Sequence, residues 1–174
     1  MVKKSLTFEE AVAPLDTDKK KLAAGLHERA LALGYIPFIE KAGKKDGNFK
    51  IEYKVGKKTY VLFISRISKN DLSVGCKLLY LSEYIHLIDE LNETVRNELL
   101  ASRPCKVDSG CTAYISFCYE HKDYLICRHA IRLKTLNYSD LQSFWKLLEA
   151  EDSQRKLMYG KALRTTVPDA GNYL

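Results

Sequence analysis

The clearest pattern along the chain is an alternation of apolar and polar residues between positions 49 and 78. A period of two is typical of strands that cover a core with one face. The apolar positions form three groups: Phe49, Ile51, Tyr53 and Val55; Tyr60, Leu62 and Ile64; and Leu72, Val74, Cys76 and Leu78. Gly56 and Lys57 suit a two-residue turn, which would place Tyr53 opposite Tyr60. We expect an antiparallel meander in which Cys76 is a small buried apolar side chain.

Residues 112–134 alternate in the same way and predict a second hairpin, which turns at residues 121–122. In this register Tyr119 pairs with Tyr124, and Ser116 pairs with Cys127. The face expected to cover the core holds Ala113, Ile115, Phe117, Tyr119, Tyr124 and Ile126. The opposite, mixed face holds Thr112, Tyr114, Ser116, Cys118, Leu125, Cys127, His129 and Ile131. The two hairpins match at an offset of 64 residues, so they are either a duplicated unit about a pseudo-twofold axis or two unrelated amphipathic hairpins.

Apolar residues at helical spacing predict three helices. Asp16 or Thr17 suits the N-cap of the first helix, and Gly34 suits its end. Residues 82–101 are expected to be helical with a break near Asn92, and Ser139 is expected to cap the last helix. The predicted fold class is α+β, a mostly antiparallel sheet built from two hairpin units with about three helices packed on one face.

Residues 35–42 predict one further strand. Pro37 places this strand at a sheet edge, because proline has no amide hydrogen for a strand ladder. For the domain organisation we expect an N-terminal arm at 1–15, a single α+β domain at 16–150 and a C-terminal extension at 151–174.

Composition narrows the function classes only a little. The 174 residues include 28 Lys and Arg against 22 Asp and Glu, a net charge of +6. The positive charge is spread along the chain, which favours a solvated basic surface and leaves nucleic acid as an alternative partner. The longest apolar run, residues 60–64, is far shorter than the roughly 20 residues of a spanning helix. No membrane partner is expected.

Five cysteines and no recognisable signal sequence predict free thiols in the cytoplasm. A zinc site built from Cys105, Cys111, Cys118, Cys127 and His129 is not favoured, because their spacing lacks the close ligand pairs of structural zinc sites. On one extended strand, Cys111 and Cys118 would lie about 23 Å apart and could not share a metal. A redox-sensitive pair or a partial metal site at Cys105 and Cys111 stays open. No cofactor is predicted.

The mixed face of the second hairpin carries the candidate site. Its composition is typical of the wall of a small-molecule pocket, although a sheet face half covered by the C-terminal extension would look the same. The candidate ligand-binding residues are Tyr114, Cys118, Cys127 and His129. His27 is expected at the surface. No Walker loop, nucleophile elbow or dinucleotide fingerprint is present, so no catalytic residue is predicted.

The first function hypothesis is therefore a non-catalytic module that binds a small molecule or a partner. The alternatives are a nucleic-acid-associated basic protein and a thiol- or metal-dependent enzyme. The oligomeric state is left open.

The element order resembles that of small bacterial α+β proteins from families of unknown function. The resemblance is carried by the turn at Gly56–Tyr60 and by the helix starts at Leu91–Arg96 and Tyr138–Leu141. The doubled hairpin pattern is also similar to that of the effector-binding domains related to a gyrase-inhibitor protein, which implies a small-molecule ligand between two halves. The acidic residue at the centre of that family's pocket cannot be placed here, so no residue role is transferred.

Overall fold

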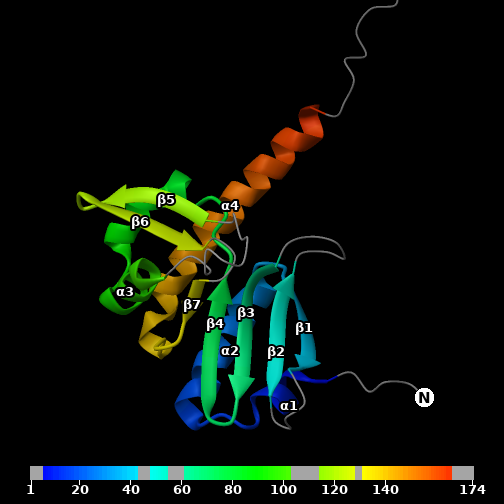
Figure 1. Ribbon diagram of the computed structural model, residues 1–174. Helices are drawn as coiled ribbons and strands as arrows, with labels where there is room; N and C mark the ends of the chain where they lie inside the picture. The colour runs from blue at the N-terminus through cyan, green and yellow to red at the C-terminus, as the bar shows by residue number, and fades with distance from the viewer. Residues whose placement is uncertain (1–5, 43–47, 55–60, 103–113, 128–130, 166–174) are drawn as a thin grey trace, which may run out of the picture.

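The computed structural model describes residues 6–42, 48–54, 61–102, 114–127 and 131–165, with side chains as far as residue 158. Figure 1 shows the elements in space. In chain order they are α1 (Phe8–Val12), α2 (Thr17–Ala32), β1 (Ile36–Lys41), β2 (Phe49–Lys54), β3 (Val61–Ser68), β4 (Asp71–Cys76), the 3₁₀ helix η1 (Leu81–Glu90), α3 (Glu93–Ala101), β5 (Tyr114–Tyr119), β6 (Lys122–Cys127), β7 (Ile131–Leu133), the 3₁₀ helix η3 (Tyr138–Asp140) and α4 (Leu141–Thr165).

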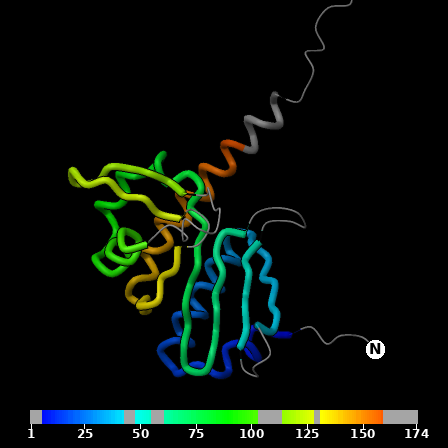
Figure 2. Tube along the Cα trace, in the orientation of Figure 1, coloured from blue at the N-terminus to red at the C-terminus, as the bar shows by residue number. Residues whose placement is uncertain are grey.

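Five strands form one antiparallel sheet in the order β1-β2-β3-β4-β7, and β5 and β6 form a second sheet of two strands. Helix α2 lies behind the large sheet in Figure 1, and the opposite face of that sheet carries no described helix. Figure 2 traces the chain from β4 through η1, α3 and the β5–β6 hairpin, and then back to β7 beside β4. The predicted α+β class with mostly antiparallel strands is confirmed.

The first hairpin pairs in a different register from the predicted one. Phe63, and not Tyr60, lies opposite Tyr53. The next pair on β2 joins Lys54 to Val61, which leaves Leu62 as the extra residue of a β-bulge on β3. The observed register differs from the predicted one by three residues, and an odd shift moves side chains to the other face of a strand. The buried residues of β3 are therefore Phe63, Ser65 and Ile67, together with Leu62, which is buried at the bulge.

The second hairpin differs from its prediction by two residues. Tyr119 pairs with Lys122 and not with Tyr124, because the turn contains only Glu120 and His121. These two residues have φ values of 47° and 61°, as both central residues of a type I′ turn require. A shift of two keeps each side chain on its predicted face. The predicted pairing of Ser116 with Cys127 is also wrong, and Ser116 lies opposite Leu125.

The register and the sheet topology do not support a duplication. Ile115 lies opposite Ile126 on the second hairpin, whereas the matching residues of the first, Ile51 and Leu62, are not partners. The first hairpin lies inside the large sheet between β1 and β4, and the second pairs with no other described strand. The two hairpins are better interpreted as unrelated amphipathic units.

The first predicted domain boundary lies in the turn between α1 and α2, and the second lies inside α4. Residues 8–12 of the predicted arm form α1, and its Ala11 is fully buried. A helix of five residues is too short to show helical periodicity in a sequence. Residue 150 lies inside α4, which continues to Thr165. Charged residues follow the apolar stripe of this helix, and the sequence pattern therefore suggested that the packed part ended at residue 150.

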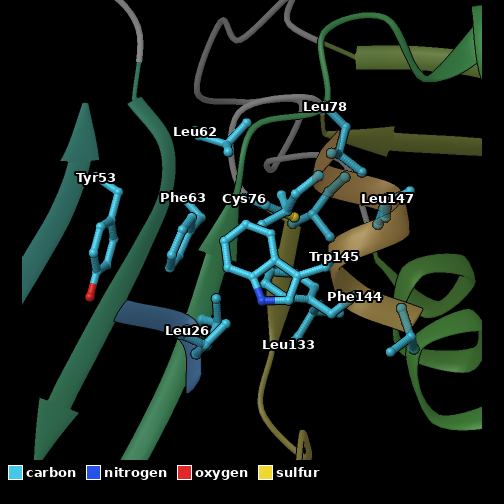
Figure 3. Packing of buried hydrophobic residues seen from close by; sticks show 14 of the residues in the cluster. Leu26, Tyr53, Leu62, Phe63, Cys76, Leu78, Leu133, Phe144, Trp145 and Leu147 are labelled. Atoms are coloured by element: carbon cyan, nitrogen blue, oxygen red, sulfur yellow. The ribbon is translucent and has the colours of Figure 1, made fainter. Parts of the chain in front are cut away.

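Aromatic rings fill the core between the large sheet and α4 (Figure 3). The ring of Tyr53 stacks on Phe63 with centroids 4.3 Å apart. The ring of Phe63 packs nearly perpendicular to the rings of Trp145 and Phe144 on α4, with centroid distances of 5.5 Å and 6.2 Å. Cys76 is 1% exposed, and burial raises the pKa of its thiol to about 12. The predicted role of Cys76 as a core residue is confirmed.

The helix ends follow local sequence signals with one exception. The carboxylate of Asp16 accepts a backbone N–H at 2.9 Å and begins α2, and Gly34 follows that helix with a φ of 83°. Asn92 caps α3 after η1, which confirms the predicted break. The last helical segment is capped by Asn137 and not by Ser139, because the single turn of η3 precedes α4.

Candidate functional site

The β5–β6 hairpin is attached to the rest of the molecule through its inner face. The side chains of Ile115, Phe117 and Tyr119 are each 8% exposed and belong to the main core. At the tip of the hairpin, the hydroxyl of Tyr119 donates a hydrogen bond of 2.7 Å to the carboxylate of Asp89 on η1. This hydrogen bond raises the pKa of Tyr119 to about 12. The inner face therefore belongs to the core, and the side chains of β5 on the outer face are exposed.

The turn geometry determines which backbone groups of β5 point outward. A hydrogen bond closes a tight turn between its first and fourth residues, so Tyr119 and Lys122 form a bonded pair. Bonded and non-bonded pairs alternate along antiparallel strands. Phe117 is therefore bonded to β6, whereas Ser116 and Cys118 direct N–H and C=O groups away from β6. Within the described part of the chain, no backbone hydrogen bond joins β5 to any other element.

Strand β5 also lacks the features that usually prevent an edge strand from pairing with another chain. Such features are charged side chains, proline and short length. The edge strand β1 carries Pro37 and Glu40, and β7 is only three residues long with Arg132 at its centre. Strand β6 begins with Lys122 and Asp123. The sequence of β5 is Tyr-Ile-Ser-Phe-Cys-Tyr, with no charge and no proline. Its composition favours strand pairing.

The outer face of the hairpin exposes apolar groups beside this edge. Tyr114 is 49% exposed and Leu125 is 43% exposed. An open hollow of about 530 Å³ lies over the middle of the hairpin and is lined by Ser116, Phe117, Cys118, Asp123, Tyr124 and Leu125. A second open hollow of about 530 Å³ separates β6 from the end of α3 and is lined by Leu100, Ser102, Lys122, Asp123, Tyr124 and Leu125. Neither hollow encloses its contents.

Negative charge collects around the hairpin although the chain as a whole is basic. Residues 81–90 and 114–127 together contain five carboxylates, Glu83, Asp89, Glu90, Glu120 and Asp123, and a single lysine, Lys122. Glu90 forms an ion pair with Lys146 of α4. The net charge of these two segments is opposite in sign to the +6 of the whole chain.

The structure places two of the predicted ligand-binding residues opposite each other and the third farther along the hairpin. Tyr114 and Cys127 lie directly opposite each other, but Tyr114 is exposed whereas Cys127 is 1% exposed. Cys118 is exposed and lies four residues from Tyr114, about 13 Å along an extended strand. His129 lies outside the described residues. Of the three described candidates, only Cys118 lines the hollow over the hairpin. Their role in binding a ligand stays a prediction.

A buried polar network on α4 was not foreseen from the sequence. Glu151 is 0% exposed and Arg155 is 1% exposed, and their side chains meet at 2.5 Å. Glu151 also accepts hydrogen bonds from the hydroxyl of Tyr84 at 2.7 Å and from the backbone N–H of Tyr80 at 3.1 Å. Burial raises the pKa of the Tyr84 hydroxyl far above its ordinary value. The network therefore joins α4 to η1.

Arg155 extends this network to the sheet. Its guanidinium donates to the carbonyl oxygen of Lys77 at 2.6 Å and to that of Val61 at 3.3 Å. Next to it on α4, Asp152 accepts a hydrogen bond from Tyr35. The sequence signal that could have revealed the network is spacing, because Leu148, Glu151 and Arg155 follow one another on one helical face. These contacts saturate the charged groups and indicate a structural role.

His27 lies in an aromatic contact that was also missed. The ring of Phe8 on α1 stacks on its imidazole with centroids 4.0 Å apart, and its Nδ1 is 3.1 Å from the hydroxyl oxygen of Tyr53. Burial lowers the pKa of His27, partly opposed by the nearby carboxylates of Glu9 and Glu28. The neutral imidazole can accept a hydrogen bond from the Tyr53 hydroxyl. The expected surface position of His27 is wrong, because α1 covers that side of α2.

The described residues show no site that would support a thiol- or metal-dependent enzyme. Cys76 and Cys118 are free thiols, Cys127 is buried, and Cys105 and Cys111 lie outside the described ranges. Within those ranges, no group of three His, Cys, Asp or Glu side chains is arranged to hold a metal ion. None of the helices in the described part of the chain has the length and apolar character needed to cross a bilayer.

Comparisons with known proteins provide no further assignment. No family model, curated protein or solved structure matches this chain. The resemblance to effector-binding domains and to small bacterial α+β proteins therefore stays an expectation from the sequence.

Proposed function

We propose that this protein is a non-catalytic binding module that recognises a segment of a partner protein at the β5–β6 hairpin. The observation that supports the proposal most is the uncharged free edge of β5 beside the exposed side chain of Tyr114. A small-molecule ligand receives less support, because small-molecule sites bury most of the ligand surface and both hollows at the hairpin are open. Within the described part of the chain, the free thiols of Cys76 and Cys118 support a reducing cytoplasm as the compartment.

The test uses peptides as probes and the whole chain as bait. A displayed library of random peptides of about ten residues, the length of a long strand, is selected for binding. Affinities of the enriched peptides are then measured by fluorescence anisotropy against two matched variants. Tyr114→Asp should weaken binding about tenfold or more, because it puts a charge beside the edge. Phe38→Asp, at a site on β1 that is 52% exposed, should leave binding unchanged.

Two results would refute this function. One is a selection that enriches no peptide. The other is a loss of binding in Phe38→Asp as large as the loss in Tyr114→Asp.

The outer face of the large sheet favours a second candidate function, the binding of nucleic acid. Arg66 on β3 and Arg132 on β7 lie on either side of β4, where Gly75 leaves the face uncovered. Both arginines are exposed and form no ion pair within the described ranges, whereas Lys50 on the same face pairs with Glu40. A single-stranded oligonucleotide should then bind with steep salt dependence, and Arg66→Glu should weaken it. Absence of binding at low ionic strength would contradict this second candidate.

A further inference from the structure

The free edge of β5 points to a specific mode of binding and a specific kind of partner. We infer that the occupant is an extended, basic segment of another protein, which adds to β5 as a third strand of the small sheet. This inference rests on the proposed function and specifies how the partner binds.

The backbone of β5 offers a regular set of unused hydrogen-bonding groups. Tyr114, Ser116 and Cys118 are the residues whose N–H and C=O groups point away from β6, because the bonded pairs alternate from Tyr119 at the turn. Outward groups on every second residue, about 7 Å apart, match the repeat of a neighbouring strand. An antiparallel or parallel segment of five or six residues could therefore bond along the whole edge.

The packing of the hairpin gives a reason for a third strand to bind. A two-stranded sheet is marginal by itself, and a further strand adds cross-strand contacts on both faces. On the inner side the added strand would cover what remains exposed of Ile115 and Phe117. On the outer side its side chains would lie beside Tyr114 and Cys118. Apolar or aromatic side chains at alternate positions of the partner fit both rows.

The surrounding charge favours a basic partner. The hairpin and η1 carry five carboxylates against one lysine. Glu83 is exposed, and Glu120 and Asp89 both act on Tyr119 at the tip of the β5 edge, where Arg96 of α3 partly opposes them. Lysine or arginine side chains that flank the added strand would be attracted to this region. Two copies of the chain paired through β5 would instead bring two acidic regions together, so a second copy is the less favourable occupant.

The decisive variant changes one outward backbone group and nothing in the β5–β6 ladder. Ser116→Pro removes an outward N–H and places a ring where the partner backbone would approach. Ser116→Ala removes the same hydroxyl and keeps the N–H, so it is the matched control. Leu125→Pro makes the equivalent change on the outer edge of β6. Each folded variant is titrated with the enriched peptides described above, by fluorescence anisotropy at low and at high salt.

The inference predicts three results together. Ser116→Pro should weaken binding about tenfold or more, and Ser116→Ala should stay within about twofold of the unchanged protein. Leu125→Pro also removes an exposed apolar side chain, and it should weaken binding less than Ser116→Pro does. The enriched peptides should be rich in Lys and Arg, and their affinity should fall as salt is raised. A second readout does not depend on the variants: on peptide binding, amide hydrogen exchange should slow at Ser116 and Cys118 of the unchanged protein.

The outcomes separate the inference from the proposed function. If peptides bind and lose affinity in Tyr114→Asp, but neither Ser116→Pro nor the amide exchange responds, strand addition is wrong and the binding module stands. If Leu125→Pro is the variant that loses binding, the edge is β6 and the inference is overturned. Acidic peptides without basic residues would contradict the charge argument. Sedimentation that shows a dimer dissociated by Ser116→Pro would identify the occupant as a second copy and would also overturn the inference.

Discussion

Removal of Arg155 is expected to be among the most damaging single changes in this chain. The side chain is 1% exposed and donates to Glu151, which is 0% exposed, and to two backbone carbonyl groups. In Arg155→Ala, one carboxylate oxygen of Glu151 loses its buried partner. Loss of one member of a buried ion pair costs about 3–5 kcal/mol, because the other charge stays desolvated. With an m-value of about 2 kcal/mol/M, the urea midpoint should fall by about 2 M.

Urea unfolding followed by the fluorescence of Trp145 measures this loss directly. Trp145 is the only tryptophan of the chain, and it packs against Phe63 on the same helix face as the network. A matched control is Arg29→Ala, because Arg29 forms an ion pair with Glu149 of α4 at the surface, where it is half exposed. The free energy of unfolding of this control should fall by only about 0–1 kcal/mol, and by less at high salt.

A double-mutant cycle tests the mechanism behind the loss. Glu151→Gln in the Arg155→Met background removes both charges and keeps an oxygen for the hydroxyl of Tyr84. The free energy of unfolding of the double variant should exceed, by about 2–3 kcal/mol, the value expected from adding the losses of the single variants Glu151→Gln and Arg155→Met. Additive single losses, or an Arg155→Ala loss below about 1 kcal/mol, would refute the view that this pair is desolvated and coupled.

Three further predictions concern local features of the fold. His27 should contribute to the free energy of unfolding an amount that is complete above about pH 6.5 and is lost as pH falls through the lowered pKa of the folded state. In His27→Gln this part of the pH dependence of stability should vanish, and an unchanged pH profile of that variant would contradict the prediction. Asn92→Asp keeps the cap of α3 but places a second carboxylate beside Asp140, so it should destabilise the fold by about 1–3 kcal/mol at pH 7 and less at pH 4, in urea titrations at both pH values; equal stability to the unchanged protein would refute the contact. Gly34→Ala meets no atom within 4 Å, so its cost should be the left-handed backbone alone, about 1–2 kcal/mol in thermal unfolding; a much larger loss would show a steric conflict.

The periodicity of the sequence predicted most of the elements and their inner faces. Strands around Ile51, Val74 and Phe117 were found where alternation placed them, and Pro37 correctly placed β1 at an edge. The register was not predictable in the same way. At the first hairpin a bulge at Leu62 decided it, and at the second hairpin the left-handed backbone of Glu120 decided it. Neither residue carries the glycine or asparagine signal by which such backbone is usually recognised.

The candidate site was only partly visible in the sequence. The hairpin and its two faces were predicted, but the sequence did not show that Tyr114 is exposed while its cross-strand partner Cys127 is buried. The buried pair of Glu151 and Arg155 was missed because charged residues on a helix usually lie on its solvent-exposed face. Its burial depends on η1 and on the ends of the strands, which are distant in sequence.

By itself the sequence determined most of the local elements, the core face of most strands and the absence of charge and proline in β5. Among the described residues, the tertiary structure decided that the outer edge of β5 has no strand partner, because β7 joins β4 and the β5–β6 hairpin forms a separate sheet. The physical reason is that the alternation of side chains indicates which face of a strand is buried. The backbone N–H and C=O groups are the same for nearly all residue types, so the sequence does not reveal which strand they pair with. Only the assembled sheet order shows which of those groups remain unused.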